Sequence, residues 1–382
     1  MKTHITKKWV IEERWDWSKL VTFIPNKNLP VHSWFYFKEG FSRDFVYSMI
    51  NLLKLKTNCR VLDPFVGSGT TLLTCKEVGI PSVGIDAAPL AVFVSQVKTA
   101  DYDIQKLKDT AREVFEKKFE KPNLSQVSKF TKKFFSKPSL EDIIFFREEI
   151  RKIEDPVIRN FFTLALMNSA MKVSYAYKDG AVLKVVKKHV PPFRRFFKRV
   201  VKKMIRDLKK IDLKPCTVEV YLGDARKMHF LEDESFNAVI TSPPYLNKIE
   251  YTKVYAIEYE LFFGDVKVDP VRSYIGLNPK NIIDQFPELN LPEAAKAYFY
   301  DMKLVLEEIY RVLKKKGKAV IVVAGGVFPD RIVESDILLA DLAERVGFRV
   351  DRIIAVNKRV ATVKRVIKIG EARESIIILS KT

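Results

Sequence analysis

The chain has 382 residues, of which 47% are hydrophobic, so it is long enough to bury one large core or two smaller ones. An apolar run of about 18 residues is missing, the start has no apolar stretch, and Cys59, Cys75 and Cys216 have neither metal-ligand nor disulfide spacing. These features argue against a membrane span, a signal peptide and a metal site, and we expect a cytoplasmic protein. The 67 lysines and arginines against 47 acidic residues give a net charge of +20, which favours nucleic acid as the partner over a merely solvated basic surface.

Strand and helix signals alternate at both ends of the chain. Residues 59–65 and 82–87 have the apolar pattern of buried strands, and a helix runs between them from Thr70 to near Gly79. Further strands are predicted at 217–223, 236–242, 318–324, 348–356 and 374–380, with helices at 293–315 and 335–346 that end at Gly317 and Gly347. This order predicts an α/β fold with a doubly wound, mostly parallel sheet of seven strands.

Residues 102–214 interrupt the alternation, because they are helical in periodicity and poor in strand signals. We interpret them as an insertion between the second and third strands. The chain then divides into 1–101, the first part of the catalytic domain, 102–214, a basic helical insertion, and 215–382, the rest of the catalytic domain.

The end of the insertion is strongly basic. Between 184 and 210 there are twelve lysines and arginines, and Asp207 is the one acidic residue. From Pro192 onward the apolar spacing predicts an amphipathic helix with one docked face and one basic face. We expect this region to bind nucleic acid, and the alternative is that its basic face is only solvated. The residues expected to contact nucleic acid are Lys187, Lys188, Arg194, Arg195, Lys198, Arg199, Lys202 and Lys203.

The turn after the first predicted strand has the composition of a cofactor loop. Gly67 and Gly69 let the backbone approach a ligand closely, and the helix that starts at Thr70 presents free N–H groups to an anion. The carboxylate of S-adenosylmethionine (SAM) fits, as does a nucleotide phosphate, but no lysine follows the second glycine as a P-loop requires. The candidate cofactor residues here are Asp63, Pro64, Phe65, Gly67, Ser68, Gly69, Thr70 and Thr71.

Two further acids follow predicted strands. Asp86 is placed to bind the ribose hydroxyls of a nucleoside cofactor, and Asp224, followed by Ala225, to accept a hydrogen bond from an adenine amine. Each alone has the alternative role of a helix N-cap. Their position at successive strand ends favours the cofactor interpretation.

A second motif, Ser242-Pro243-Pro244-Tyr245, follows the fourth predicted strand. The prolines stiffen the turn and remove two backbone donors, which leaves acceptors. Ser242 adds a hydroxyl, and Tyr245 a flat ring for a base. Acceptors of this kind suit the N–H groups of an aryl amine, whose lone pair can then attack a methyl group without a covalent intermediate. We predict that these four residues are catalytic rather than a simple turn.

With these motifs, residues 31–101 and 216–382 resemble the SAM-dependent amino-methyltransferases that modify exocyclic amines of nucleobases. The resemblance implies a Rossmann-like class I methyltransferase fold, with SAM held by the first motif, Asp86 and Asp224. It also implies that the segment from His32 to Ser42, including Trp34 and Phe41, is an additional cofactor motif. A serine at the first position of the second motif is most similar to the N4-cytosine members, which include archaeal enzymes acting on RNA or DNA.

The substrate is the point on which the sequence leaves alternatives. We expect methylation of cytosine N4 in structured RNA, with ribosomal RNA and dimethylation among the outcomes, because no DNA-recognition domain is evident and the low glutamine content is typical of hyperthermophiles. The alternatives are a site-specific DNA N4-cytosine methyltransferase, a non-catalytic SAM-binding protein, and a protein-glutamine methyltransferase, which Ser242 and the charge disfavour. After the second motif, Lys248, Tyr251 and Lys253 are expected to bind the nucleic-acid substrate.

Overall fold

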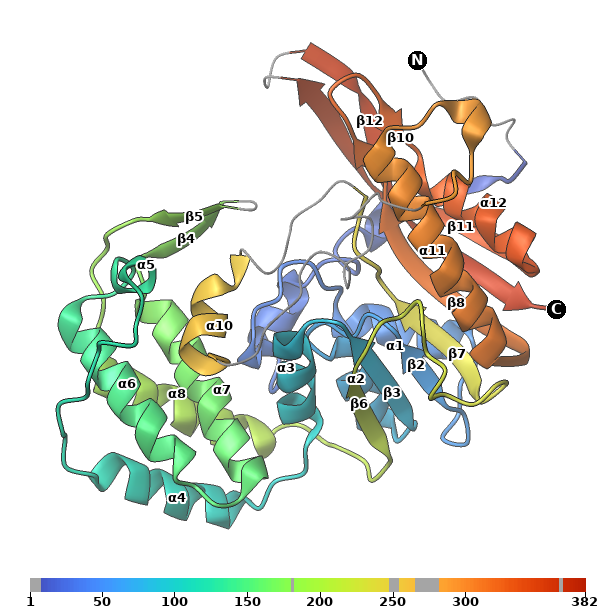
Figure 1. Ribbon diagram of the computed structural model, residues 1–382. Coiled ribbons are helices and arrows are strands. Elements are labelled where there is room, and N and C mark those ends of the chain that lie inside the picture. Colours follow the sequence, from blue (N-terminus) through green and yellow to red (C-terminus); the bar gives the residue numbers. More distant parts are fainter. Residues whose placement is uncertain (1–7, 180–181, 247–253, 265–281, 364–366) are drawn as a thin grey trace.

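The computed structural model describes residues 8–179, 182–246, 254–264, 282–363 and 367–382 (Figure 1). Their centre is an eight-stranded sheet in the order β1-β11-β12-β8-β7-β2-β3-β6. The strands are β1 (Ile11–Glu13), β2 (Val61–Asp63), β3 (Ser82–Asp86), β6 (Val218–Leu222), β7 (Phe236–Thr241), β8 (Leu313–Ala324), β11 (Phe348–Val363) and β12 (Ile367–Lys381). The mostly parallel sheet confirms the predicted Rossmann-like methyltransferase fold.

The order in which the chain adds strands to the sheet reverses at the middle of the sheet. From β2 the chain proceeds to β3 and β6 on one side, all parallel, and then returns to β7 and β8, which are also parallel. β12 pairs antiparallel with β8, and β11 antiparallel with β12. The switch between β2 and β7 is where an open α/β sheet forms a ligand crevice, and both motifs follow these two strands.

Helices cover both faces of the sheet. Alternate side chains of β8 belong to the cores on the two opposite faces of the sheet. Val320 and Val322 belong to the core beneath α1, whereas Ile321 and Val323 belong to the core beneath α11 and α12. Outside the 102–214 segment, the helices are α1 (Arg43–Leu52), α2 (Thr70–Val78), α3 (Pro89–Thr99), α10 (Ala256–Phe262), α11 (Glu293–Val312) and α12 (Ser335–Val346) in the residues described. Among the residues that the structure describes, no helix combines the length and apolarity needed to cross a membrane.

The 102–214 segment forms a helical body beside α3 (Figure 1). It consists of α4 (Ile104–Glu116), α5 (Lys129–Lys132), α6 (Lys137–Arg151), α7 (Pro156–Val173) and α8 (Phe193–Leu208), together with the hairpin β4 (Ala176–Asp179) and β5 (Val182–Val185). Short elements elsewhere are the 3-10 turns Trp15–Trp17, Ile24–Asn28, His32–Trp34 and Pro287–Leu289 and the pair β9 (Gly326–Val327) and β10 (Ile332–Val333).

Four predictions about elements need correction. The sheet has an eighth strand, β1, which pairs with β11 from near the N-terminus. The helix predicted to reach residue 315 ends at Val312, because Leu313 already pairs with Phe236 of β7. β11 and β12 extend well beyond their predicted ranges as one long hairpin. The insertion contains the β4–β5 hairpin, where we expected few strands.

Candidate active site

The carboxylate of Asp63 joins the two motifs. Its Oδ1 accepts a hydrogen bond from the Thr241 hydroxyl at 2.6 Å, and its Oδ2 accepts one from the Thr71 hydroxyl at 2.7 Å. Asp63 is 2% exposed, and burial raises its pKa to about 6. Asp63 therefore holds the end of β2, the first turn of α2 and the end of β7 together. This places Ser242 next to the glycine loop.

The loop after β2 has a backbone that only glycine adopts easily. Gly67 and Gly69 have φ angles of 52° and 76°, and Gly69 is the N-cap of α2. A Cβ at Gly69 would lie 2.9 Å from the Ser95 hydroxyl. The rest of the loop is largely buried: Pro64, Ser68 and Thr70 are buried, and Phe65 packs against the α11 side of the core.

Two side chains of α3 support this loop from behind. The Ser95 hydroxyl donates to the Gly67 carbonyl at 3.0 Å, and Lys98 Nζ donates to the Ser68 carbonyl at 2.7 Å. Lys98 is 1% exposed, and burial lowers its pKa to about 7. Because a neutral amine also donates, this titration leaves the bond to Ser68 in place.

Asp86 connects the second strand to the same loop. Its Oδ2 accepts from the Gly67 N–H and its Oδ1 from the Ala88 N–H, both at 2.9 Å. Burial raises the pKa of Asp86 to about 6, yet the residue is only partly covered. Each carboxylate oxygen keeps a second lone pair for a ligand hydroxyl. A glycine loop without Cβ atoms, a helix N-terminus and this carboxylate together fit the amino-acid and ribose parts of SAM.

Asp224 has a strong partner of its own. Both of its oxygens accept from the Arg226 guanidinium, at 2.7 Å in the shortest contact, and Arg226 continues to Asp301 of α11 at 2.8 Å. The side chain of Asp224 remains 28% exposed, while Ala225 is buried in the core. The pairing fastens the segment after β6 to α11, and a contact with adenine stays a prediction.

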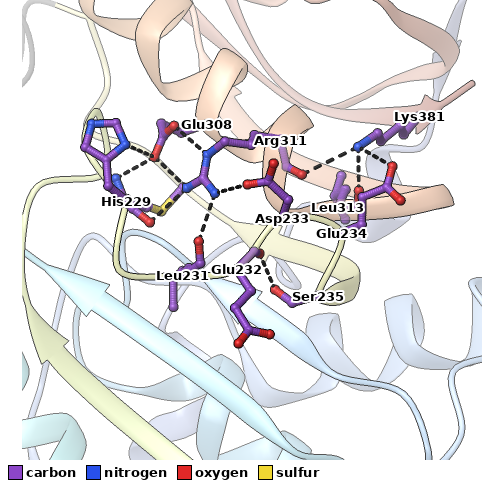
Figure 2. Close-up of polar contacts among 11 residues, drawn as sticks. His229, Leu231, Glu232, Asp233, Glu234, Ser235, Glu308, Arg311, Leu313 and Lys381 are labelled. Atoms are coloured by element: carbon purple, nitrogen blue, oxygen red, sulfur yellow. Dashed lines mark hydrogen bonds and ion pairs between the residues drawn. The ribbon is translucent and has the colours of Figure 1, made fainter.

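Farther along, the same segment is fastened to α11 by Arg311. Its guanidinium donates to the carbonyls of Met228 and Leu231 and to the carboxylates of Asp233 and Glu308, as Figure 2 shows for this network. The chain between β6 and β7 is thus held at both of its ends. This fixes the approach to β7 and its motif.

The Ser-Pro-Pro-Tyr motif is anchored by residues of the neighbouring strands. The Ser242 hydroxyl donates to the Val322 carbonyl of β8 at 3.2 Å, and the Tyr245 hydroxyl donates to Glu374 Oε1 of β12 at 2.7 Å. Pro243 is buried, whereas Ser242, Pro244 and Tyr245 are partly exposed. The motif is therefore both rigid and accessible at the end of β7.

The N-terminal aromatic segment meets the loop through a different residue than predicted. His32 Nε2 lies 3.2 Å from Glu77 near the far end of α2, and burial lowers the pKa of His32 to about 4. Trp34 Nε1 donates to Asp207 of α8 at 3.1 Å, and Phe41 packs against Phe45 of α1. The structure does not bring these three predicted cofactor residues to the loop.

Phe37 and Tyr255 are the residues that the sequence interpretation missed. A Cβ at Gly67 would lie 3.1 Å from Phe37 Cε1, so this ring lies against the loop. The Phe37 and Tyr255 rings are parallel, with an interplanar angle of 3° and centroids 6.2 Å apart. Phe37 lies inside the segment that the resemblance selected, although it was not among the predicted cofactor residues. Tyr255, the N-cap residue of α10, ends the segment after the second motif whose aromatic and basic residues were expected to contact the substrate.

The basic residues on α8 are not equivalent. Arg195, Lys198, Arg199 and Lys202 are exposed. The Arg194 guanidinium instead lies over the rings of Phe119, Phe145 and Phe146, and Lys203 Nζ donates to Asp207 at 2.7 Å. Arg194 and Lys203 therefore have protein partners, although Lys203 is exposed as well, and their contact with nucleic acid stays a prediction.

Other predicted substrate contacts lie around these elements. Lys187 and Lys188 are exposed after β5. Lys248, Tyr251 and Lys253 lie outside the described residues. In the described ranges, no group of three or more histidine, cysteine or acidic side chains is arranged to hold a metal ion.

Sequence comparisons decide the class of protein. A profile of the DNA methylase family matches residues 2–96. The Type II methyltransferase M.AvaI of Nostoc sp. is 26% identical over 404 residues, covering 88% of this chain and 83% of that protein. The chain is a SAM-dependent methyltransferase, and it is similar in sequence to these DNA methylases. M.BsoBI of Geobacillus stearothermophilus is also 26% identical to this methyltransferase, over 424 residues that cover 89% of this chain and 83% of that enzyme.

Solved structures match the methyltransferase more distantly. TrmN from Thermus thermophilus has a TM-score of 0.34 at 10% identity and covers 89% of this chain and 49% of that one. A putative methyltransferase from Bacillus halodurans has a TM-score of 0.35 at 11% identity and covers 88% and 98%. Since both scores are below 0.5, the description of the fold rests on the strand order.

Proposed function

We propose that this methyltransferase transfers a methyl group to the exocyclic N4 amine of cytosine in DNA. The observation that carries the proposal is the Asp63 junction, which holds the Ser-Pro-Pro-Tyr motif beside the glycine loop through Thr241 and Thr71. A motif that binds an amine and a loop that binds a methyl donor are thereby placed at the same switch point of the sheet.

The hydrogen bonding of Ser242 supports its role toward an amine. Because its hydroxyl donates to the Val322 carbonyl, the lone pairs of the Ser242 oxygen are left to accept. Together with a carbonyl of the proline turn, Ser242 accepts from the two N–H groups of cytosine N4. These bonds draw the nitrogen toward tetrahedral geometry and make its lone pair available. The Tyr245 ring, fixed by Glu374, offers a stacking surface for the base.

The chemistry then balances in one displacement. SAM supplies a methyl group bound to a positively charged sulfur. The N4 lone pair forms the new N–C bond while the S–C pair stays on sulfur, and the amine releases one proton to water through its acceptors. The residues of this chain orient the amine and hold it in line, which is the main source of acceleration when two reactants are bound together.

The relatives favour DNA over the RNA substrate that we expected from the sequence. The matching profile describes DNA methylases, and the named relatives are Type II methyltransferases. Their alignments cover so much of this chain that the 102–214 insertion is not wholly outside them. A basic helical insertion is thus compatible with DNA-modifying relatives, and we propose that 102–214 binds DNA. The choice of cytosine N4 rather than adenine N6 as the methylated amine rests on Ser242.

The proposal is tested with purified full-length enzyme and isotopically labelled SAM. Unmethylated genomic DNA and ribosomal RNA are offered separately, digested and analysed as nucleosides by mass spectrometry. We expect N4-methyldeoxycytidine from DNA. N6-methyldeoxyadenosine would contradict the choice of base, and methylated cytidine from RNA alone would contradict the choice of DNA.

Variants of the motif separate catalysis from SAM binding. Ser242→Ala and Tyr245→Ala are expected to lower turnover by at least about 100-fold, as loss of a group that orients or polarises the reacting atom does. SAM affinity, measured by calorimetry, is expected to stay near that of the wild type. Normal turnover in both variants would show that the motif is only a turn, and SAM binding without transfer by the wild type would favour a non-catalytic protein.

A further inference from the structure

The β4–β5 hairpin is a two-stranded ribbon that pairs with no other sheet in the part of the chain described. Its register pairs Tyr177 with Lys184 and Lys178 with Leu183. Because side chains alternate across a ribbon, Lys178 and Leu183 lie on one face and Tyr177 and Lys184 on the other. The two faces have different surroundings.

The inner face is fixed to the catalytic domain. Lys178 Nζ donates to Glu258 Oε1 of α10 at 2.8 Å and lies 3.8 Å from the centroid of the Tyr255 ring. Glu258 is 1% exposed, and Leu183 packs against the core. Tyr255 is the ring that stacks on Phe37 beside the glycine loop. The hairpin is thus fastened to the aromatic wall next to the proposed SAM site.

The base of the ribbon is also fixed. The Tyr175 N–H donates to the Phe134 carbonyl, and the Val186 N–H donates to the Tyr175 carbonyl, both at 2.7 Å. These two bonds and the Lys178 contact define the direction of the hairpin. In Figure 1 it projects from the insertion, above α10, toward the side of the molecule that carries the β11–β12 hairpin.

The outer side combines exposed apolar and cationic groups. Tyr177, on the outer face, is 57% exposed, and Val186, directly after β5, is 49% exposed; the next residues, Lys187 and Lys188, are also exposed. Two large hydrophobic side chains left open at one short ribbon indicate a contact surface. The lysines and the net charge of +20 indicate that the partner is a polyanion with apolar faces, which describes a nucleic acid.

We propose that the β4–β5 hairpin enters the groove of duplex DNA beside the target base, with Tyr177 and Val186 against the bases and Lys187 and Lys188 on the phosphates. The inference rests on the proposed function for the identity of the nucleic acid. A two-stranded ribbon has the width that the major groove of duplex DNA admits. Its anchor on α10 places this contact at a fixed distance from the methyl-transfer site, so the hairpin selects which base reaches Ser242.

The test compares full-length variants on one duplex that the wild type methylates. Tyr177→Ser and Val186→Ser remove the apolar contacts, and the pair Lys187→Met and Lys188→Met removes the charges. Leu52→Ser, at the exposed end of α1, and the pair Lys314→Met and Lys315→Met, exposed on β8, are the matched controls outside the insertion. Duplex dissociation constants at several salt concentrations, KM for DNA, kcat, and SAM affinity are measured for each.

The two kinds of contact give different results. Tyr177→Ser is expected to weaken duplex binding and raise KM by roughly tenfold, as loss of an aromatic contact with a base does, with little change in the salt dependence. The double lysine variant is expected to lower the slope of log affinity against log salt by about 1.8. SAM affinity is expected to stay unchanged in both, because Tyr177 is exposed on the outer face and Lys187 and Lys188 are exposed beyond the end of β5.

Three outcomes would overturn the inference. The first is a Tyr177→Ser enzyme with the duplex affinity and KM of Leu52→Ser. The second is a changed oligomeric state in sedimentation with unchanged DNA affinity, which would assign the surface to a protein partner. The third is an unchanged salt slope in the lysine variant. If the wild type methylates no DNA, the proposed function fails, whereas duplex binding by the same variants still tests the hairpin.

Discussion

Burial raises the pKa of both Asp63 and Asp86 to about 6, but the two carboxyl groups have different neighbours. Asp63 accepts from two threonine hydroxyls of the protein, whereas Asp86 accepts from two backbone N–H groups and remains partly exposed. We therefore propose Asp86, rather than Asp63, as the carboxylate that binds a ribose. Asp63 acts on the site by holding its two motifs together.

Titration of Asp86 predicts a pH dependence of SAM binding. Above pH 6 the carboxylate is ionised and accepts from the ribose hydroxyls, and as the pH falls through 6 it takes up a proton and loses acceptor strength. If only the ionised form binds well, the apparent dissociation constant rises roughly fourfold between pH 7.5 and 5.5. Calorimetry over this range checks it. Asp86→Asn is expected to bind SAM more weakly and with less pH dependence, and a full pH effect in that variant would assign the effect to Asp63.

Glu374 is a positioning residue for Tyr245. The Tyr245 hydroxyl donates to Glu374 Oε1 at 2.7 Å, and Asn357 donates to the other oxygen at 3.2 Å. Glu374→Ala is expected to lower kcat/KM for the nucleic acid by roughly tenfold while SAM affinity is unchanged, because a charge-assisted bond that orients the ring is lost. Glu374→Gln keeps an acceptor and should recover most of the activity. Equal losses of activity in both variants would instead show that the negative charge of Glu374 is needed, and that a neutral hydrogen-bond acceptor is not sufficient.

At the scale of elements, α8 has a docked face, two cations with protein partners, Arg194 and Lys203, and an exposed basic face. Replacing Arg195, Lys198, Arg199 and Lys202 with glutamine is expected to reduce the salt slope of nucleic-acid binding by up to about 3.6, since each phosphate contact contributes about 0.9. Filter binding over a salt series measures the slope. The control is Lys314→Gln with Lys315→Gln, exposed lysines at the opposite end of β8 from the motifs. A slope equal to that control would mean that the α8 face is only solvated.

The elements that the sequence predicted well are those whose signals are local. The helix at 335–346 matches α12, because Gly347 adopts a φ of 119° that ends it. The end of α11 was missed, since Leu313 continues the apolar spacing of the helix and is claimed by β8 only through its partner Phe236. β1 has three residues and exists through pairing with β11. Such long-range pairing has no signature within a short window.

The same distinction applies to the site. The glycine loop and the Ser-Pro-Pro-Tyr turn are each one continuous stretch of sequence. Both motifs, and their positions at the ends of strands, could therefore be predicted from the sequence. Glu374 is 129 residues from Tyr245, and Phe37 and Tyr255 meet only through folding. The contact of Arg194 with the Phe146 ring comes from packing and has no local signal, whereas Lys203 and Asp207 are four residues apart on α8, a spacing that favours an ion pair within a helix.

At the scale of the whole molecule, the insertion and the catalytic part share one core. Val31, Trp34, Leu73 and Val94 of the catalytic part belong to the same cluster of buried side chains as Phe161 of α7. The boundary at residue 102 thus separates two segments of sequence without separating two cores. We therefore expect the two parts to unfold together in a single cooperative transition, since shared burial couples their stability.

Asp207 is the polar contact on which this shared core can be tested. It is 6% exposed and accepts from Trp34 Nε1 at 3.1 Å and from Lys203 Nζ at 2.7 Å. Asp207→Ala leaves the buried indole N–H without its acceptor, at a cost of about 1–3 kcal/mol in the free energy of unfolding, measured by chemical denaturation. Trp34→Phe combined with Asp207→Ala should cost less than the sum of the two single changes, because neither partner is then left unpaired.

The same variant distinguishes the two interpretations of Trp34. The contacts place its indole N–H on α8 rather than at the glycine loop, so Asp207→Ala is expected to lower stability and leave SAM affinity unchanged under conditions where the protein is fully folded. The sequence resemblance, in contrast, assigns the segment around Trp34 to the cofactor. A weaker SAM affinity with unchanged stability would therefore restore the cofactor role of Trp34 and contradict the shared core.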